Sequence, residues 1–272
     1  MTTPQVPGLP VPDAVAGGLL LSRYQNSQQL VSVRAALAIR NLWIQMISPR
    51  NFSATWKRYQ PVVNGIIDTH YQMTAANAAE YYGHARVVAG NRPVTIPGVT
   101  LDPEYLVKET GMMGPGQFYH FLEDHDPDTA SAMARDSLQG AGARMVMNGG
   151  RDTVTKAAAG DPMAEGWERV IEPGACGFCA MLAGRGAVYK ETTVSFRAHD
   201  HCHCVARAVF IGQESVNREI GDQWAEATKG TRGKAAIAAW NKYWESRHGT
   251  DIGATAKESP EARAGNAPIA IE

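Results

Sequence analysis

Apolar residues recur at helical spacing from Leu19 to Ile47. They form two neighbouring stripes, of which the first holds Leu30, Val33, Leu37, Ile44 and Ile47 and the second holds Val31, Ala35, Ala38, Leu42 and Met46. Because the two stripes together make a wide apolar face, we expect this helix to be packed on two sides. Pro49 would end it, since proline cannot continue the hydrogen bonds of a helix interior.

A second long helix is predicted to begin just after Pro49. Asn51 or Ser53 can cap its N-terminus with a side-chain oxygen, and the helical pattern continues to about Val88. Pro61 lies inside this span. Because proline removes a backbone donor and clashes with the preceding turn, we expect Pro61 to bend or split the helix.

A short helix is predicted after an irregular or extended crossing near residues 91–99. Asp102 followed by Pro103 is typical of a helix cap with a first-turn proline. Glycines and a proline are concentrated between Gly111 and Gly116. We expect them to interrupt the chain, because both residue types disfavour a continuous helix.

One more helix is predicted before residue 160. Asp128 or Thr129 can cap it, and the pattern suggests about twenty residues. The run Asn148-Gly149-Gly150 would end it, because glycine readily adopts the left-handed conformation of a helix terminus. Residues 18–160 therefore predict four or five helices and no strand.

After Gly160 the sequence pattern changes from helical to strand-like. Short runs rich in β-branched residues predict strands over residues 166–171, 186–190 and 204–211. An amphipathic stretch from Glu214 to Trp244 then predicts a last helix, with a break near residues 230–233.

The predicted fold class is α+β. It has a mainly α-helical N-terminal part, a small β-containing C-terminal module stapled by metal, and a final helix. The predicted organisation is an extended arm over 1–17, a helical domain over 18–160, a small metal-bearing sheet over 161–212, a C-terminal helix over 213–248 and a mobile tail over 249–272.

Charge and hydropathy narrow the class of protein. Lys and Arg number 26 against 27 Asp and Glu, which gives a net charge of −1. Specific nucleic-acid binding is therefore not expected, and the cations Arg185, Lys190, Arg197 and Arg207 near the cysteines are its only support. We expect no membrane association and no signal peptide, and hence folding in a reducing cytoplasm.

All 4 cysteines lie between Cys176 and Cys204, with histidines among them. A C-x-x-C turn followed by a second cluster some twenty residues later is typical of a zinc site. Five donors compete for four places: Cys176, Cys179, His199, Cys202 and Cys204. His201 and His203 are spares. A disulfide is the alternative, but in a reducing compartment clustered cysteines more often hold metal.

The surplus of donors favours structural zinc over catalytic zinc. A catalytic site keeps one position open for water, whereas a saturated, thiolate-rich site is a poor Lewis acid. Pro173 to Cys179 resembles half of the zinc-deaminase pattern, but no His-x-Glu precedes it. The run from His120 to His125 does not fit either zinc-protease spacing, and we interpret it as a solvated acidic turn.

The cysteine-rich half resembles a known family. Residues 167–170, 175–183, 185–189, 199–204 and 209–210 are similar to the minor head proteins of tailed actinobacterial phages, relatives of the phage Mu F-like head-morphogenesis family. That family's signature is a His, two residues, Cys, one residue and Cys, and here His199, Cys202 and Cys204 occupy those places. Residues 24–86 resemble its helical front half more weakly.

The resemblance implies a structural protein of the virion, inside the head near the portal, that assembles in the host cytoplasm. Its implied partners are the portal protein and the major capsid or scaffold protein. Some members of the family are labelled capsid maturation proteases, so a protease acting on scaffold or capsid protein is the alternative. Its candidates are Ser195, His199 and Asp200, but His199 is better used as a ligand.

Among the ligands, Cys176, Cys179 and Cys202 are the surest, and His199 or Cys204 would complete the shell. A strand-like segment would point residues 202 and 204 to the same side, whereas His199 can reach back across a turn. The two candidates for the fourth position are therefore nearly equal, and no catalytic residue is assigned.

Overall fold

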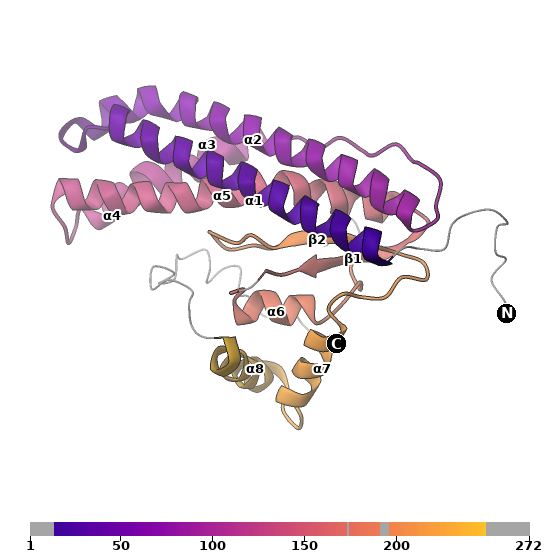
Figure 1. Cartoon of the computed structure of the whole chain (residues 1–272). Coiled ribbons are helices and arrows are strands. Elements are labelled where there is room, and N and C mark those ends of the chain that lie inside the picture. Colours follow the sequence, from indigo (N-terminus) through magenta and orange to yellow (C-terminus); the bar gives the residue numbers. More distant parts are fainter. Residues whose placement is uncertain (1–13, 173, 191–195, 249–272) are drawn as a thin grey trace.

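The computed structural model describes residues 14–172, 174–190 and 196–248 and confirms the α+β fold class. A layer of long helices covers a small sheet, and short helices lie beneath the sheet (Figure 1). In chain order the helices and strands are α1 (Ala14–Met46), η1 (Pro49–Asn51), α2 (Phe52–Val88), α3 (Pro103–Gly111), η2 (Met112–Gly116), α4 (Gln117–Phe121), α5 (Pro127–Gly160), β1 (Ala164–Val170), α6 (Gly177–Ala183), β2 (Val205–Phe210), α7 (Arg218–Ala227) and α8 (Gly233–His248).

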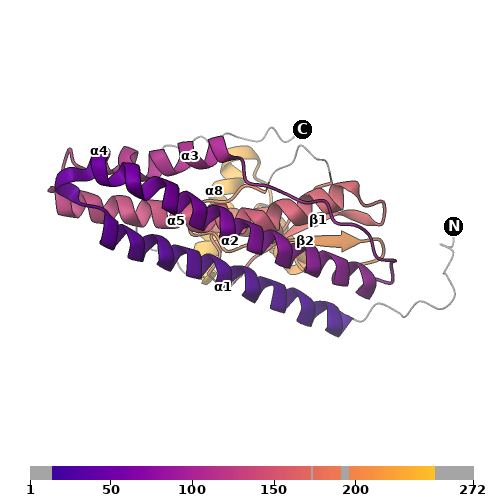
Figure 2. The ribbon, with the colours of Figure 1, turned by 90° about the horizontal axis from the view of Figure 1, so that it is seen from above.

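The helices α1, α2 and α5 run side by side along the molecule (Figure 2). Helix α1 contributes Val31, Ala35, Ile39 and Trp43 to their shared core. Only one of its two predicted stripes is buried, so the expectation of packing on two sides is wrong within the described chain. Leu30 and Leu37, from the other stripe, are exposed, because α2 and α5 cover a single side of α1.

The predicted helix caps are confirmed only in part, since Asn51 precedes α2 without making a side-chain hydrogen bond to its first turn. The side chain of Asp102 accepts a hydrogen bond from Glu104 N at 2.9 Å, which confirms the predicted cap of α3. Helix α2 runs unbroken from Phe52 to Val88 through Pro61. Pro61 is exposed, so its ring meets solvent and not a packed neighbour. The predicted split at Pro61 does not occur.

The glycine-rich stretch after α3 does not interrupt the chain. Residues Met112–Gly116 form a π-helical turn that joins α3 to α4 in one helical run. A Cβ on Gly114 would overlap the ring of Trp56 from α2. Glycine is therefore used at this position to let two helices approach closely, and not to end one.

Helix α5 extends past the predicted terminator. Gly149 and Gly150 lie inside α5, which ends only at Gly160. A Cβ on Gly149 would overlap the carbonyl oxygen of Tyr71, and a Cβ on Gly150 would overlap the side-chain amide of Gln28. Small residues are needed at these two positions because α2 and α1 cross α5 there. This packing overrides the local preference of the two glycines for a helix end. The N-terminal cap is Asp126 and not the predicted Asp128 or Thr129, because the side chain of Asp126 accepts hydrogen bonds from the backbone amides of both residues.

The junction between helices and sheet is fastened by a buried ion pair. Asp161 follows the last residue of α5, and its carboxylate accepts from Arg86 Nε of α2 at 2.7 Å. It also accepts from Tyr82 Oη at 3.1 Å and from Met163 N at 2.9 Å. The turn from α5 into β1 is thus tied to α2.

Strands β1 and β2 pair antiparallel, with Trp167 opposite Ala208 and Val170 opposite Val205. The strand expected over residues 186–190 is reduced to one bridge between Tyr189 and Trp167. One face of the sheet lies on α5 and the other faces α6 (Figure 1). The apolar cluster at the sheet includes residues of α1, α2 and α5, so the sheet shares its core with the helical layer.

The last two helices pack on α6, and the predicted break between them is confirmed. Trp240 Nε1 donates to Gly177 O at 2.7 Å, and Trp244 Nε1 donates to Ala175 O at 2.8 Å. Helix α1 begins at Ala14, four positions before the predicted start of the helical domain at residue 18. The rest of the predicted arm, residues 1–13, and the predicted tail over 249–272 lie outside the described residues.

No single helix among the described residues is long and apolar enough to cross a membrane. The pair α1 and α2, bent by 76° at the break between them, passes by length and composition only.

Candidate metal centre

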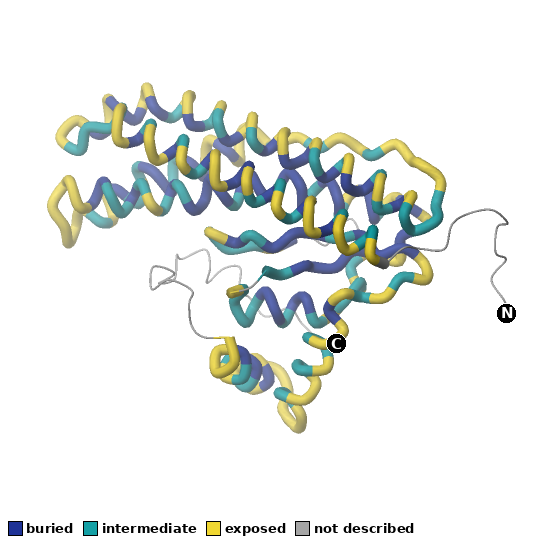
Figure 3. The backbone as a smooth tube through the Cα atoms, viewed as in Figure 1, coloured by how far each residue is buried: buried dark blue, intermediate teal, exposed yellow. Residues whose placement is uncertain are grey.

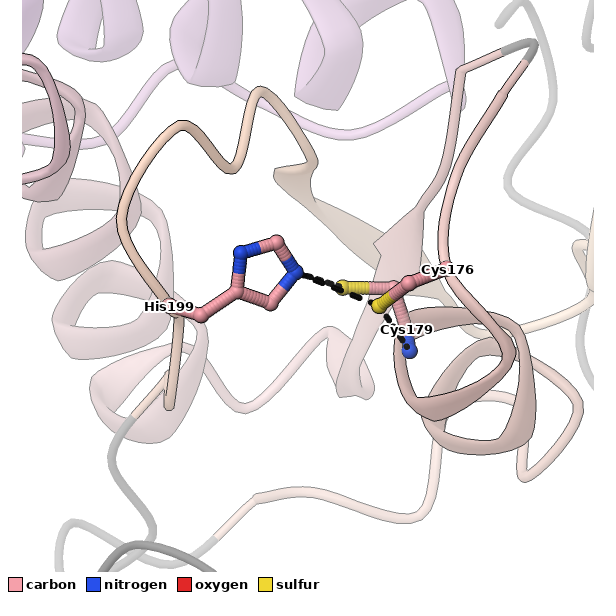
Figure 4. Close-up of side chains that lie close together, drawn as sticks. All are labelled: Cys176, Cys179 and His199. Carbon is pink, nitrogen blue, oxygen red and sulfur yellow. Dashed lines mark hydrogen bonds between the residues drawn. The ribbon is translucent and has the colours of Figure 1, made fainter. Parts of the chain in front are cut away.

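Two thiols are presented by the first turn of α6. Cys176 caps this helix, and its Sγ accepts a hydrogen bond from Cys179 N at 3.4 Å (Figure 4). A C-x-x-C sequence places both sulfurs on the same side of such a turn, because one helical turn separates them. The indoles of Trp240 and Trp244 hold the backbone on either side of Cys176.

The other donors lie in the loop that leads into β2. His199 Nε2 is 3.2 Å from Cys176 Sγ and 3.9 Å from Cys179 Sγ (Figure 4). Cys179 Sγ is 3.7 Å from Cys202 Sγ. The five predicted donors therefore come together as two groups of three, Cys176 with Cys179 and His199, and Cys179 with Cys202 and Cys204. Cys179 belongs to both groups.

These spacings suit a tetrahedral zinc shell. With Zn–S near 2.3 Å and Zn–N near 2.0 to 2.1 Å, ligand atoms lie about 3.8 Å apart for two sulfurs and about 3.6 Å apart for sulfur and nitrogen. The sulfur pair Cys179 and Cys202 matches the first value, and the two distances from His199 lie on either side of the second. The described residues can thus hold a metal ion, and Cys179 is the donor that both groups of three share.

The ring of His199 is oriented as a ligand. Its Nδ1 lies 2.7 Å from the carbonyl oxygen of Asp200, which can only accept, so Nδ1 carries the proton. In the neutral ring Nε2 then has the free lone pair, and Nε2 is the atom that faces the two sulfurs. A backbone carbonyl commonly fixes metal-binding histidines in this way.

Helix α5 positions the loop that carries the second group of donors. Arg144 Nε donates to the carboxylate of Asp200 at 2.7 Å. Arg151 donates to Cys204 O at 3.0 Å and to Cys202 O at 2.6 Å. His201, which has a positive φ of 61°, lies against Gly140, where a Cβ would overlap its ring. One face of α5 is thus a platform for the ligand loop.

Two buried arginines surround the sulfurs. Arg169 of β1 donates from Nη1 towards Cys179 Sγ at 3.6 Å and Cys202 Sγ at 4.0 Å. The guanidinium groups of Arg169 and Arg151 lie over the ring of Phe196, at 3.8 Å and 4.8 Å from its centroid. Both arginines are 1% exposed. Neither forms an ion pair with a carboxylate among the residues that the structure describes, so the thiols are the available anions.

The electrostatics of the site give the cysteine thiols different pKa values. The hydrogen bond from Cys179 lowers the pKa of Cys176 to about 4, and His199 adds to this effect. Hydrogen bonds with Cys179 and Cys204 hold the pKa of Cys202 well below its usual value, whereas contact with the anionic sulfurs raises that of Cys179. The hydrogen bond to Cys176 raises the pKa of His199 to about 9. The hydrogen bond with Cys179 would lower the pKa of Cys204, but contact with Cys202 and burial outweigh it and raise the pKa to about 12. Without an ion, the cluster thus favours thiolates at Cys176 and Cys202 and neutral thiols at Cys179 and Cys204.

The pKa values of the two buried arginines, Arg151 and Arg169, shift in opposite directions. Burial lowers the pKa of Arg151. Burial would also lower the pKa of Arg169, but the neighbouring thiols of Cys179, Cys204 and Cys202 outweigh it and raise the pKa. Arg169 is therefore the cation most directly coupled to the sulfurs.

The protease alternative finds little geometric support. Ser195 lies outside the described residues. The carboxylate of Asp200 pairs with Arg144, while the ring of His199 contacts the backbone oxygen of Asp200 and the sulfurs. His199 and Asp200 thus lack the orienting contact between imidazole and carboxylate that a catalytic triad uses. The spare His203 pairs with Glu172 at 3.2 Å.

Sequence reasoning did not identify Arg151 and Arg169 as part of the site. Arg151 follows a predicted helix end, and Arg169 lies next to Glu168 in a predicted strand, where two successive charged residues are usually solvated. The available signal was the apolar character of Trp167 and Ile171, which lie two positions from Arg169 on either side. The strand register places Arg169 opposite Ala206.

The fold and the site together define a helical protein with a small sheet and a cysteine-rich cluster that can hold a metal ion. The family model described as VG15 protein matches residues 20–229. The chain belongs to this family, which makes it a phage protein. Searches of the curated proteins and of the solved structures gave no match.

Proposed function

We propose that the chain is a structural component of a tailed-phage head, a minor head protein whose cysteine-rich segment folds around one zinc ion. Membership of the VG15 family supports a virion-related phage protein. The spacing of His199, Cys202 and Cys204, which resembles the Mu F-like signature, supports the finer assignment to head morphogenesis.

The observation that carries the zinc proposal is the pair of buried arginines facing thiols. Arg169 and Arg151 are both 1% exposed, and a buried cation is stable only beside an anion. Both charges would be uncompensated without negative charge on the sulfurs, of which those of Cys176 and Cys202 have lowered pKa values. A Zn²⁺ ion bound by three thiolates and an imidazole, or by four thiolates, keeps a net negative charge that the arginines balance.

In this proposal the zinc is structural. We expect the two groups of three, which share Cys179, to close on one ion, because their five donors exceed the four places of a tetrahedral shell and leave none that must hold water. When bound, the ion would supply folding energy to the segment that joins α6, the ligand loop and β2. Cys176, Cys179, Cys202 and either His199 or Cys204 would hold it. His201 and His203 contact Gly140 and Glu172 instead.

The proposed place of the protein is the interior of the head near the portal, after assembly in the host cytoplasm. The proposed partners are the portal protein and the major capsid or scaffold protein. These proposals are supported by the resemblance and by a fold made largely of long helices, which offers extended surfaces for docking.

Metal analysis of the purified full-length chain tests the zinc. We expect about one zinc per chain after reducing, chelator-free purification. Less than about a third of an equivalent would contradict the proposal, and another metal at full occupancy would replace zinc in it.

The virion role is tested on phage particles. We expect the protein in purified particles, and we expect deletion of its gene to lower infectivity while the capsid protein keeps its mass. Intact-mass spectrometry of the capsid protein decides between the two functions. A processed capsid N-terminus that disappears in the deletion would favour the protease. A parallel Ser195→Ala phage would then show whether Ser195 is the nucleophile.

A further inference from the structure

The outer face of α1 is apolar although nothing in the described chain covers it. Its large exposed side chains are 41% to 73% exposed and are Val15, Leu19, Leu30, Val33, Leu37 and Ile44. Figure 3 shows exposed positions recurring along the whole of α1. We call these six residues the α1 stripe. Between Leu19 and Leu30 the same side carries the exposed polar residues Ser22 and Asn26. Single exposed apolar residues are common, whereas a row such as the one from Leu30 to Ile44 marks an interaction surface.

The stripe has the geometry of a helix-packing seam. At 3.6 residues per turn its six members lie within about 60° of one another around the helix and extend over about 44 Å. Leu30, Leu37 and Ile44 are spaced at seven residues, and Val33 lies between the first two. This is the a and d spacing by which one helix receives the side chains of another, and in the same register Arg23 occupies an a position and Arg40 a d position.

The charges beside the stripe are all of one sign. Arg23, Arg34 and Arg40 are exposed on α1, and none of them forms an ion pair with a described residue. No acidic residue occurs between Ala14 and Asp68. The face therefore combines an apolar seam with uncompensated cations. A partner that covers it gains most when its own seam is flanked by carboxylates.

We propose that the α1 stripe is a docking surface for an acidic amphipathic helix of another protein. The seam would bury the partner's apolar side chains, and the three arginines would pair with glutamates or aspartates beside them. The inference rests on the proposed assembly role only in that the partner would be a component of the particle. It is independent of the zinc.

A helix fits this surface better than a lipid bilayer does. A helix lying in a membrane interface inserts a broad apolar face, whereas the exposed apolar sector of α1 is narrow and its opposite side is occupied by α2 and α5. A second copy pairing through α1 would place Arg34 and Arg40 of both copies in the same interface, which like charges disfavour.

The test uses the full-length protein and a synthetic probe. The probe is a fluorescent peptide of about four heptads with Leu at a and d and Glu at e and g. Its twin carries Lys in place of Glu. Binding is measured by anisotropy for the wild type, for Leu37→Asp on the stripe, for the control Met73→Asp and for Arg34→Glu. Met73 is a suitable control because it is 42% exposed on α2, outside the stripe, against 47% for Leu37.

We expect the acidic peptide to bind more tightly than its basic twin, with an affinity that falls as salt rises. Leu37→Asp should weaken this binding by at least about tenfold. Arg34→Glu should reduce the preference for the acidic peptide, and Met73→Asp should leave binding unchanged. Circular dichroism shows whether each variant keeps its helices.

Two further measurements, vesicle binding and sedimentation, test whether the α1 stripe binds a membrane or a second copy of the chain instead. Equal binding of both peptides, or binding insensitive to Leu37→Asp, would overturn the proposal. Binding to phosphatidylcholine and phosphatidylglycerol vesicles that Leu37→Asp abolishes, without a peptide preference, would replace it with a membrane surface. A dimer in sedimentation that Leu37→Asp dissociates would replace it with self-pairing. Zinc content and presence in the particle are measured separately, so failure here leaves the proposed function standing.

Discussion

The helical layer and the cysteine-rich segment are held together by different means. In the helical layer, α1, α2 and α5 bury apolar side chains over many turns, and glycines allow the helices to cross closely. The cysteine-rich segment has two short strands and one short helix, with polar and sulfur contacts at its centre. A large apolar interface stabilises the first, whereas in the second a bound metal ion would add to the stability that the shared apolar core provides.

The comparison also shows that the two regions are not separate. Helix α5 belongs to both, because one part of it packs on α1 and α2 while Arg144 and Arg151 hold the ligand loop. Asp161, just past its end, pairs with Arg86 of α2. Breaking one region at a time therefore measures how far its stability depends on the other.

Removing the shared thiol should have the largest effect. Cys179→Ser takes a donor from both groups of three, so we expect loss of the bound metal and a decrease of at least about 5 kcal/mol in the free energy of unfolding of the cysteine-rich segment. Hydrogen exchange would show strong deprotection of β1 and β2 and a smaller change in α1 and α2. His203→Ala is the control. Unchanged zinc content and thermal stability in Cys179→Ser would contradict a structural site.

The next prediction concerns the helical layer, where a substitution at a glycine tests how closely the helices cross. Gly149→Ala places a Cβ against the Tyr71 carbonyl oxygen, and we expect a loss of about 3 kcal/mol. The matched control is Gly83→Ala in α2, where a Cβ meets nothing within 4 Å and should stabilise by about 0.5 to 1 kcal/mol. Denaturant titration measures both. Equal effects of the two substitutions would mean that α5 does not cross α2 this closely.

The arginine beside the sulfurs should tune the metal site without abolishing the fold. Arg169→Gln removes the cation that faces Cys179 and Cys202, and we expect zinc affinity to fall about 10- to 100-fold. Competition with a chromophoric chelator gives the value. Arg185→Gln removes an exposed arginine that lies over Tyr189, and it should change the affinity little. An equal loss in both variants would point to a general charge effect.

The smallest expected effect is a pH dependence at the junction. Burial would raise the pKa of Asp161, but hydrogen bonds from Arg86, Met163 N and Tyr82 outweigh it and lower the pKa. A carboxyl with a lowered folded-state pKa stabilises the fold above its unfolded value of about 3.9, and this stabilisation is lost as pH falls through the folded value. Stability should thus decline below about pH 4.

Asp161→Asn supplies the comparison for that pH dependence. The variant should be less stable at neutral pH, because Arg86 is left without its anion, and it should lose less stability on acidification below about pH 4. Thermal melts of both proteins in the presence of zinc measure the difference. Parallel pH profiles would show that Asp161 does not contribute.

The sequence was sufficient to predict the long helices and the metal donors of the two regions. Apolar periodicity predicts α1 and α2, the Asp102-Pro103 pair predicts the start of α3, and the C-x-x-C and histidine spacing predicts all five donors that the structure brings together. These signals are local, since each depends on residues within a turn or a short motif.

The errors occur where a distant partner decides. Gly149 and Gly150 have the local preference of a helix end, yet α1 and α2 cross there and require small residues inside a continuous helix. The apolar stripe on α1 predicts burial but is exposed, because the described chain supplies no third neighbour. Arg169 resembles a surface residue until the strand register places it beside the sulfurs. No pattern within one element contains this information.

The platform that α5 provides has a consequence for biosynthesis. Arg144 and Arg151 precede their loop partners Asp200 and Cys202 by 56 and 51 residues, so the ribosome completes α5 well before it makes the loop. At 5 to 20 residues per second this interval is roughly 3 to 11 seconds, far longer than a helix needs to form. The last donors therefore emerge onto a scaffold that has had time to assemble, and the timing of translation itself separates helix packing from capture of the ion.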